Sequence, residues 1–318
     1  MNVLLKVCLL AIAIVWPTSS VASDFFSLSA LKAADKKPLA SLHYIKSTDN
    51  IFLAYRPYFP TNANAVLIFF HGGGAHSGLS YNYLGIGLRD NFNIAVYMPD
   101  IRGHGSSEGA RGDAPNKEQV WADINTIIQQ ARRRYPQQLI YVGGHSSGAG
   151  LALNYSNWSQ REDIDGYVFL APYFGYKSET NHDDANNRVE FSDVNTLKFI
   201  LNSVSFGLLA GHDKAVMFNF PEQVLKNNPE IVTFNTVNMS NALTPSEPDT
   251  QIANLTRFGL WIGERDEAFD AQKVTKFANE NSTQVDNEIK ILKDDTHFSI
   301  ILSGAEYIGR YIQESISE

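Results

Sequence analysis

Residues 143–150 read GGHSSGAG and could hold a reactive serine. The motif G-x-S-x-G fits this stretch with Ser146 at its centre, and in that motif a sharp turn from strand to helix holds the serine in a strained conformation. Glycine is needed on both sides because a Cβ atom there would collide with neighbouring backbone. A strand-like run at 139–142 precedes the motif, so we predict Ser146, and not Ser147, as a nucleophile. A loop rich in glycine and serine is the alternative interpretation.

A serine hydroxyl is a weak nucleophile and needs a general base, which a carboxylate must orient. In α/β folds that carry a serine on such a turn, the chain order is serine, then acid, then histidine. Three histidines follow the serine: His182, His212 and His297. The first two lie in an irregular segment, whereas His297 follows the strand-like run 288–293. We therefore predict His297 as the base.

The acid should follow the preceding strand-like run, which ends at Gly263 in the stretch RFGLWIGERDEAFD. Asp266 lies three residues beyond this glycine, far enough into the loop to turn back toward the histidine. We predict Asp266 as the orienting carboxylate. Asp270 and Glu264 stay open as alternatives.

Acyl transfer also needs hydrogen-bond donors for a developing oxyanion. The N–H of Ser147, the residue after the nucleophile, is one candidate. The second should come from HGGG at 71–74, which follows the apolar run 65–70. We predict Gly73, with Gly72 as the next choice. A tight turn that merely requires glycine is the alternative reading of HGGG.

Short apolar runs alternate with helix-length segments along the chain. Residues 39–56 resemble a hairpin, and further strands are expected at 65–70, 94–98, 139–143, 166–172, 257–263 and 288–293. Helices are expected between them, as at 117–135 and 271–280. This alternation predicts an α/β fold with a mostly parallel central sheet and helices on both faces.

Residues 173–255 interrupt the alternation and are rich in Asn, Asp and Phe. Helical spacing places Leu197, Ile200, Leu201, Val204 and Leu208 on one apolar face. We predict a helical cap inserted over the site, with 24–172 and 256–318 forming the core. A surface elaboration without a gating role is the alternative.

The first residues indicate export. Lys6 is followed by an apolar run at 7–16 and by the small residues SSVAS, which is typical of a signal peptide cleaved after Ser23. An uncleaved anchor is the alternative. Cys8 is the only cysteine, so a mature chain would have no disulfide. We expect a periplasmic or secreted protein.

Charge and motif content exclude several other classes of function. The formal net charge is −8, and the one dense basic run, 132–134, sits at a predicted helix end, so no nucleic-acid partner is expected. His71, His76 and His104 are scattered over two loops without a metal-binding spacing. Gly85 and Gly87 lack a third glycine for a dinucleotide site. We expect neither a metal nor a cofactor.

Five ordered motifs resemble the α/β-hydrolase superfamily, most closely its monoacylglycerol lipase-like and lysophospholipase-like branch, which is grouped with the serine aminopeptidase S33 type. They are HGGGAHSG, PDIRGHGSSEG, GGHSSGAG, GERDEAFD and THFSI, spread over residues 40–315. The resemblance implies a triad of Ser146, Asp266 and His297, with an oxyanion hole from Gly73 and Ser147. It departs at Ser147, where that branch often has Met or Gln, and in the segment 173–255.

These observations together predict a serine hydrolase that cleaves carboxylic esters through an acyl-enzyme. The apolar face at 197–208 suggests that an acyl chain lies under it. Together with the resemblance, it favours lipid-like substrates, monoacylglycerols or lysophospholipids, and transient contact with lipid surfaces. A serine aminopeptidase is the main alternative and would need a carboxylate near the site to hold an amine. Candidates for it are Glu179, Asp183, Asp184, Glu190 and Asp193. A non-catalytic binding protein of the same fold is the last alternative, and the oligomeric state stays open.

Overall fold

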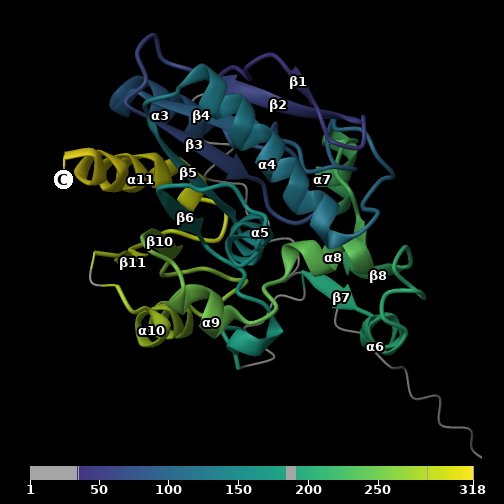
Figure 1. Cartoon of the computed structure of the whole chain (residues 1–318). Coiled ribbons are helices and arrows are strands. Elements are labelled where there is room, and N and C mark those ends of the chain that lie inside the picture. Colours follow the sequence, from purple (N-terminus) through teal and green to yellow (C-terminus); the bar gives the residue numbers. More distant parts are fainter. Residues whose placement is uncertain (1–33, 35, 184–190, 285, 318) are drawn as a thin grey trace, which may run out of the picture.

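A single eight-stranded sheet forms the centre of the molecule (Figure 1). The structure is a computed structural model that describes residues 34, 36–183, 191–284 and 286–317. The strands lie in the order β1-β2-β4-β3-β5-β6-β10-β11, and all run in the same direction except β2, which is antiparallel to both of its neighbours. Their bounds are β1 His43–Lys46, β2 Phe52–Tyr58, β3 Ala65–Phe70, β4 Ile94–Pro99, β5 Leu139–His145, β6 Gly166–Leu170, β10 Phe258–Gly263 and β11 Glu288–Leu292. The predicted mostly parallel sheet is confirmed. Each strand predicted from residue 65 onward agrees with an observed strand to within two residues, and the predicted hairpin begins four residues before β1.

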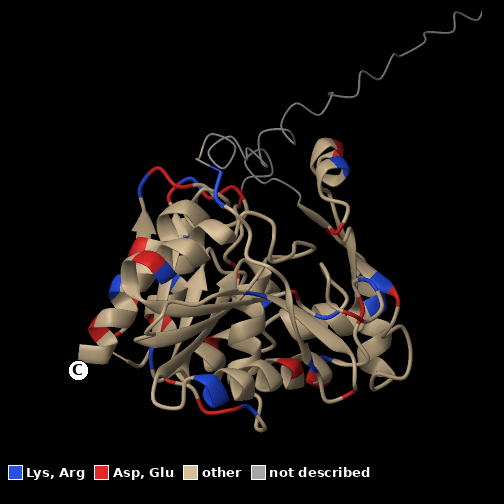
Figure 2. Ribbon diagram, turned by 90° about the horizontal axis from the view of Figure 1, so that it is seen from above, with Lys and Arg blue, Asp and Glu red and all other residues tan. Residues whose placement is uncertain are grey.

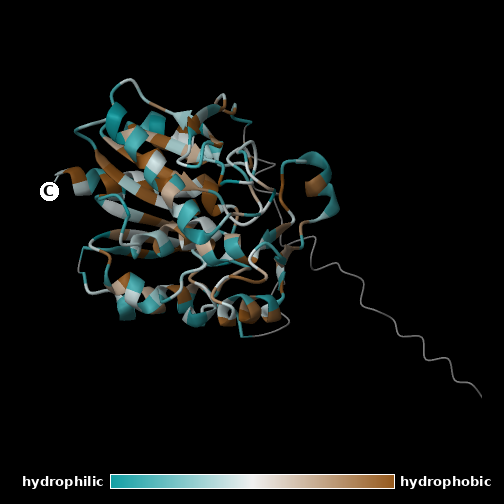
Figure 3. Cartoon of the chain, turned by 45° about the vertical axis from the view of Figure 1, so that its right-hand side comes forward, coloured by the Kyte–Doolittle hydropathy of each residue, from teal (hydrophilic) through white to brown (hydrophobic). Residues whose placement is uncertain are grey.

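Helices cover both faces of this sheet. Helices α3 (Asn82–Phe92) and α11 (Ile300–Ser317) pack on one face, and α4 (Lys117–Arg134), α5 (Ser147–Ser156) and α10 (Ala271–Asn281) pack on the other. Strand β3 is apolar throughout because its side chains are buried on both faces of the sheet. Val66, Ile68 and Phe70 pack on one face, and Ala65, Leu67 and Phe69 pack on the other. Figure 3 shows these hydrophobic strands at the centre.

The strand order places a crevice beside the predicted nucleophile. From β3 the chain continues outward to β4 in one direction and to β5 in the other, so the order reverses between β3 and β5. Loops that follow neighbouring strands diverge at such a point, and ligands of open α/β sheets bind there. The loop after β3 holds HGGG, and the turn after β5 holds Ser146.

The insertion at 173–255 is not purely helical, so that prediction was wrong. It contains helices α6 (Thr196–Val204) and α7 (Glu222–Asn227), but also a three-stranded antiparallel sheet, here called the cap sheet, of β7 (Ser192–Val194), β8 (Lys214–Phe218) and β9 (Phe234–Thr236). These strands are three to five residues long. Runs so short lack a readable alternation, and this is why the sequence did not reveal them.

The end of the insertion packs against the main body. Helix α8 (Val237–Leu243) lies on α4 and α5, and α9 (Pro248–Ala253) lies on α5 and α10. A short 3-10 helix, Tyr176–Ser178, follows β6. The wall above the carboxyl edge of the sheet is therefore built from the cap sheet and α8 together (Figure 1).

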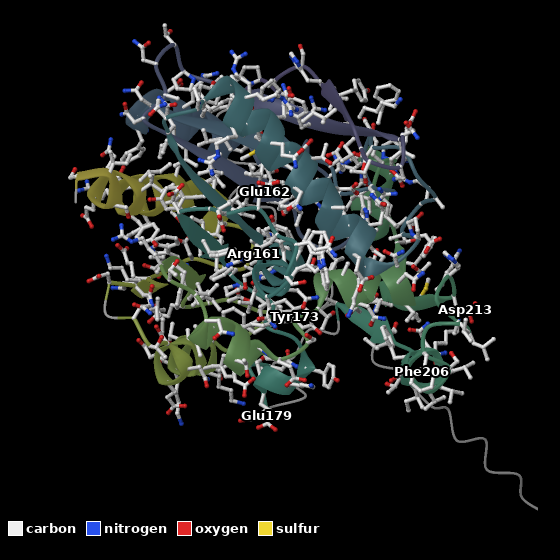
Figure 4. All side chains as sticks on the ribbon, viewed as in Figure 1. Arg161, Glu162, Tyr173, Glu179, Phe206 and Asp213 are labelled. Atoms are coloured by element: carbon white, nitrogen blue, oxygen red, sulfur yellow. The ribbon has the colours of Figure 1, made fainter. Side chains whose placement is uncertain are left out.

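The predicted apolar face of α6 forms, but it points into solvent instead of covering the site. Leu197 is 72% exposed, Val204 67% and Leu208 86%. Figure 4 shows the neighbouring Phe206 at the outer end of the insertion, far from Tyr173. The expectation that this face lies over an acyl chain is corrected accordingly.

A buried ionic cluster fixes the loop after β4. Arg102, 2% exposed in its side chain, bonds Asp123 and Asp49 at 2.7 and 2.8 Å. Burial raises the pKa of Asp123, although Arg102 opposes this effect. The loop therefore depends on a cation held between two carboxylates.

Replacing Arg102 by methionine should lower the free energy of unfolding by about 3–5 kcal/mol, because Asp123 would be left buried and unpaired. Urea denaturation followed by circular dichroism measures the change. Arg310→Met is the matched control: Arg310 is 68% exposed beside Glu306, and its loss should cost less than about 1 kcal/mol. Equal effects of the two substitutions would show that the buried cluster contributes nothing.

Candidate active site

Ser146 occupies a strained turn between β5 and α5. Its φ of 55° and ψ of −121° lie in a region that residues with a side chain rarely adopt. Its N–H donates to the Leu170 carbonyl at 3.0 Å, and its own carbonyl accepts from the N–H groups of Gly150 and Tyr173. These bonds hold the strained backbone in place and present the hydroxyl at the carboxyl edge of the sheet.

The two glycines that flank Ser146 are required by close backbone approach. A Cβ atom on Gly144 would lie 2.4 Å from the Gly148 carbonyl carbon, and one on Gly148 would lie 2.4 Å from the Phe70 carbonyl oxygen. Helix α5 thus begins directly against the end of β3. Any larger residue at either position would displace the turn.

His297 and Asp266 meet above the carboxyl ends of β11 and β10. The His297 Nδ1–H donates to Asp266 Oδ2 at 2.8 Å, while Oδ1 of the same carboxylate accepts the N–H groups of Ala268 and Phe269 at 2.9 Å each. The Asp266 side chain is fully buried and that of His297 nearly so. A protonated Nδ1 leaves Nε2 of a neutral imidazole as the basic nitrogen, which is the tautomer that a general base needs.

The alternative acids have other roles. Asp270 caps α10, since its Oδ1 accepts the N–H groups of Gln272 and Lys273. Glu264 is exposed. Glu267, which the sequence did not single out, accepts the backbone N–H of His297 at 3.0 Å, and burial raises the pKa of its carboxyl group. Asp266 is therefore the carboxylate that orients the imidazole.

The loop after β3 faces the start of α5. The Gly72 N–H donates to the Tyr81 hydroxyl at 2.8 Å, which removes Gly72 as an oxyanion donor. The Gly73 N–H forms no hydrogen bond within the described part of the chain, and a Cβ on Gly73 would lie 3.3 Å from Ser147 Oγ. Ser147 is the first residue of α5, where N–H groups have no intrahelical acceptor. Gly73 and Ser147 thus present their N–H groups beside Ser146, the predicted nucleophile.

A chain of buried hydrogen bonds links this loop to the histidine loop. The Tyr81 hydroxyl lies 3.0 Å from His145 Nδ1, and His145 Nε2–H donates to the His297 carbonyl at 2.8 Å. Because Nε2 must carry the proton, Nδ1 accepts from Tyr81. Burial lowers the pKa of His145 well below its ordinary value. His145, the residue before Ser146, is therefore a neutral connector whose hydrogen bond holds the His297 carbonyl.

The histidines considered as metal ligands serve the loops instead. His71 Nε2 accepts the Ile101 N–H, and His104 Nδ1–H donates to the Arg102 carbonyl. Burial lowers the pKa of both imidazoles to about 3. Over the described residues, no group of three or more His, Cys, Asp or Glu side chains could hold a metal ion.

Two cavities meet at Ser146 and His297. The smaller, of about 20 Å³, lies toward Tyr81, His145 and Phe298. The larger, of about 240 Å³, extends beneath the cap sheet and is lined by residues from the core and from the insertion. Aromatic side chains separate the two cavities. The rings of Phe191 and Phe218 are stacked with their centroids 5.4 Å apart, and the ring of Phe220 is edge-on to that of Phe191. A substrate can therefore place a small group on one side of the serine and a larger group on the other.

The fold and this arrangement define an α/β-hydrolase of the serine type: a serine on a strained strand-to-helix turn, a buried acid–histidine pair and two backbone donors. The sequence model of the family described as "Serine aminopeptidase, S33" matches residues 61–300, and the chain belongs to this family. The resemblance inferred from the five motifs is thereby confirmed.

The individual relatives match only part of the chain, at 24% and 34% identity. The chain is 24% identical to the monoglyceride lipase of Rattus norvegicus over 171 residues, which are 54% of each chain. A Dictyostelium discoideum abhydrolase domain-containing protein is 34% identical over 42% of this chain, but only 14% of that protein is matched. The chain thus spans about half or less of these curated relatives.

Solved structures share the fold at low identity. A soluble variant of monoglyceride lipase from Saccharomyces cerevisiae, in complex with a substrate analog, has a TM-score of 0.65 at 14% identity, covering 88% of this chain and 97% of that one. Est1E from Butyrivibrio proteoclasticus with bound ferulic acid has a TM-score of 0.62 at 17% identity, covering 87% and 100%.

Mild acid should destabilise the protein through its buried neutral histidines. The folded-state pKa of His71 and His104 is about 3, against an ordinary 6.5, so the unfolded chain binds more protons below pH 6.5. Each such histidine should lower the free energy of unfolding by about 1.4 kcal/mol per pH unit as the pH falls from 6.5 toward 3.

Urea unfolding at pH 7.5, 6.0 and 5.0 measures this slope in a window above the titration of ordinary carboxylates. His104→Asn is the matched variant, since the asparagine amide can still donate to the Arg102 carbonyl but does not titrate. This variant should reduce the dependence of the unfolding free energy on pH by about 1.4 kcal/mol per pH unit, the contribution of one histidine. A stability that is constant from pH 7.5 to 5.0 would contradict the burial of neutral imidazoles.

Proposed function

We propose that this protein is an exported serine esterase that hydrolyses carboxylic esters of lipid-like, uncharged substrates through an acyl-enzyme. The observation that supports this most directly is the placement of Ser146 and His297 on one cavity, with His297 bonded to buried Asp266 at 2.8 Å. The similarity to monoglyceride lipases adds the substrate class.

In the proposed reaction Ser146 Oγ attacks the ester carbonyl carbon while His297 Nε2 takes its proton. The oxyanion of the tetrahedral intermediate accepts hydrogen bonds from the N–H groups of Gly73 and Ser147. As the intermediate collapses, the imidazolium returns the proton to the leaving alcohol. Water, deprotonated by the same imidazole, then attacks the acyl-serine carbonyl. The acyl–Oγ bond breaks, the imidazolium returns the proton to Ser146 Oγ, and the acid is released.

Monoacylglycerols fit the larger cavity better than lysophospholipids do. None of the described residues that line it is Lys or Arg, so none of them offers a cation to a phosphate group. Figure 2 shows the charged residues dispersed over outer helices and loops, with both signs intermingled. This distribution likewise gives no support to a nucleic-acid partner.

A serine aminopeptidase is the second candidate function, which the family name keeps in view. Of the carboxylates proposed to hold an amine, those that the structure describes do not support it. Glu179, Asp183 and Asp193 are absent from the described lining of the cavity, and Asp183 is paired with Lys273 at 2.5 Å. Figure 4 shows Glu179 at the edge of the molecule. Asp184 and Glu190 lie outside the described residues.

Export is proposed from the sequence, since the predicted signal peptide at 1–23 lies outside the described residues. Among the helices that the structure describes, none is long and apolar enough to span a membrane. Expression of the full chain in a bacterial host, followed by the intact mass of the product, tests cleavage after Ser23.

Transient contact with lipid surfaces is proposed from the exposed face of α6 and the turn after it. Its apolar side chains are displayed to solvent on the side away from the core, and a lipid surface could bury them. The residues are Leu197, Ile200, Leu201, Val204, Phe206 and Leu208.

Changing Leu197, Val204 and Leu208 together to glutamine should weaken sedimentation with phosphatidylcholine vesicles about tenfold or more, because the apolar area available for insertion is lost. Hydrolysis of a water-soluble ester should be unchanged. The triple change Lys276→Gln, Lys290→Gln and Arg310→Gln on exposed polar positions is the control. Vesicle binding that is equal in wild type and both variants would exclude this surface.

A fluorophosphonate probe tests the esterase proposal directly. The wild-type chain should gain the mass of one adduct, and Ser146→Ala should gain none while keeping its circular dichroism spectrum. Asp266→Asn should label and hydrolyse about 10⁴-fold more slowly, because the imidazole loses the partner that sets its tautomer. An adduct that persists in Ser146→Ala, or a well-folded wild type that never labels, would refute the proposed nucleophile.

A further inference from the structure

The larger cavity contains polar atoms that the protein itself leaves unsatisfied. Ser147 Oγ, Asn235 Oδ1 and Ser240 Oγ are buried and form no hydrogen bond with any described residue, and all three residues line the cavity. Asn235 is 2% exposed and Ser240 is 5% exposed. Native proteins satisfy most buried polar atoms, because each unsatisfied one costs about 1–3 kcal/mol. Three unsatisfied polar atoms in one cavity beside the proposed nucleophile indicate that a molecule bound in the cavity supplies their hydrogen-bond partners.

The three residues come from separate elements that are built to converge. Ser147 begins α5, Asn235 lies in β9 and Ser240 lies in α8. The β8–β9 pairing shifts register between Lys214 and Val216, directly opposite Asn235. Such a bulge re-aims side chains near functional sites.

Helix α8 is fixed independently of the cavity. The Thr236 hydroxyl caps its first turn and donates to Asp113 Oδ1 at 2.7 Å, and α8 packs against α4 and α5. Ser240 and Asn235 are therefore held in place without using their own side-chain oxygens.

We propose that these residues form a subsite for a neutral, hydroxyl-bearing group of the substrate. A hydroxyl can donate to Asn235 Oδ1 and can both donate to and accept from the two serine hydroxyls. The described lining holds no Lys, Arg, Asp or Glu, so a charged group would find no counter-ion among these residues. Phe218 and Phe269 supply apolar walls around the polar atoms.

The subsite lies close to the reacting bond at one end. Ser147 Oγ faces Gly73, one of the two proposed oxyanion donors, whereas Asn235 and Ser240 belong to the elements that form the wall of the insertion. The hydroxyl can belong to the alcohol half or to the acyl half of the ester. This inference rests on the proposed esterase function and specifies its substrate.

Two pairs of esters distinguish these sources. Glycerol 1-butyrate and propyl butyrate differ only in hydroxyls on the alcohol, and methyl 3-(4-hydroxyphenyl)propionate and methyl 3-phenylpropionate differ only in a hydroxyl on the acyl group. Wild-type kcat/KM should favour the hydroxylated member of one pair by about tenfold or more, the equivalent of one satisfied hydrogen bond.

Ser240→Ala and Asn235→Leu should reduce that preference about tenfold, toward equal use of both members. Ser156→Ala, on α5 with its hydroxyl bonded to the Leu153 carbonyl, is the matched control and should keep the wild-type ratio. Circular dichroism and fluorophosphonate labelling verify folding and the nucleophile in each variant.

The outcomes separate the two proposals. If no ester is cleaved and no adduct forms, the esterase function fails. If esters are cleaved but the wild type shows equal kcat/KM within both pairs, the subsite is refuted while the esterase stands. Variants that lose activity equally on both members of the preferred pair would also refute it, because a packing role affects both alike.

Discussion

The backbone contact between the end of β3 and the start of α5 is the constraint on which the site depends. Gly148 lies so close to the Phe70 carbonyl that no Cβ fits, and this proximity forces the turn that strains Ser146. The same contact places the loop after β3 beside α5, so that Gly73 and Ser147 face one another. The predicted nucleophile and the predicted oxyanion donors are thus positioned by a single close approach of two backbones, without any flexible side chain.

The histidine side of the site is positioned by a different means. Asp266 is held by two backbone N–H groups before it meets His297, and Glu267 holds the backbone of the same histidine. The chain through Tyr81 and His145 then ties the His297 carbonyl to the loop after β3. Burial keeps His145 neutral, which preserves its one donor and one acceptor. The two halves of the site therefore cannot move apart without breaking buried hydrogen bonds.

The sequence predicted the parts whose signal is local. Continuous apolar strands, the G-x-S-x-G spacing and the order serine, acid, histidine are readable because each depends on residues near one another in the chain. Glu267 and Tyr81 were missed because their roles depend on contacts across the fold: Tyr81 reaches His145, 64 residues away. The cap sheet was missed because its strands are too short for a readable pattern. The apolar face of α6 was expected to cover the site because amphipathic spacing shows that such a face exists, but not what packs against it.

The contrast between the two apolar features of the insertion bears on substrate choice. The face of α6 has the pattern expected of a lipid-binding wall, yet it is turned to solvent, whereas the wall that meets the cavity combines Val194 and Phe218 with unsatisfied Asn235 and Ser240. A site evolved only for hydrocarbon would lose nothing by replacing those polar residues, and it would gain stability by removing unpaired buried oxygens. Their presence beside Ser146 is therefore better explained by a substrate that is apolar in part and hydroxylated in part. Such a substrate would be recognised by hydrogen bonds inside the cavity, while the α6 face remains available for an outer surface.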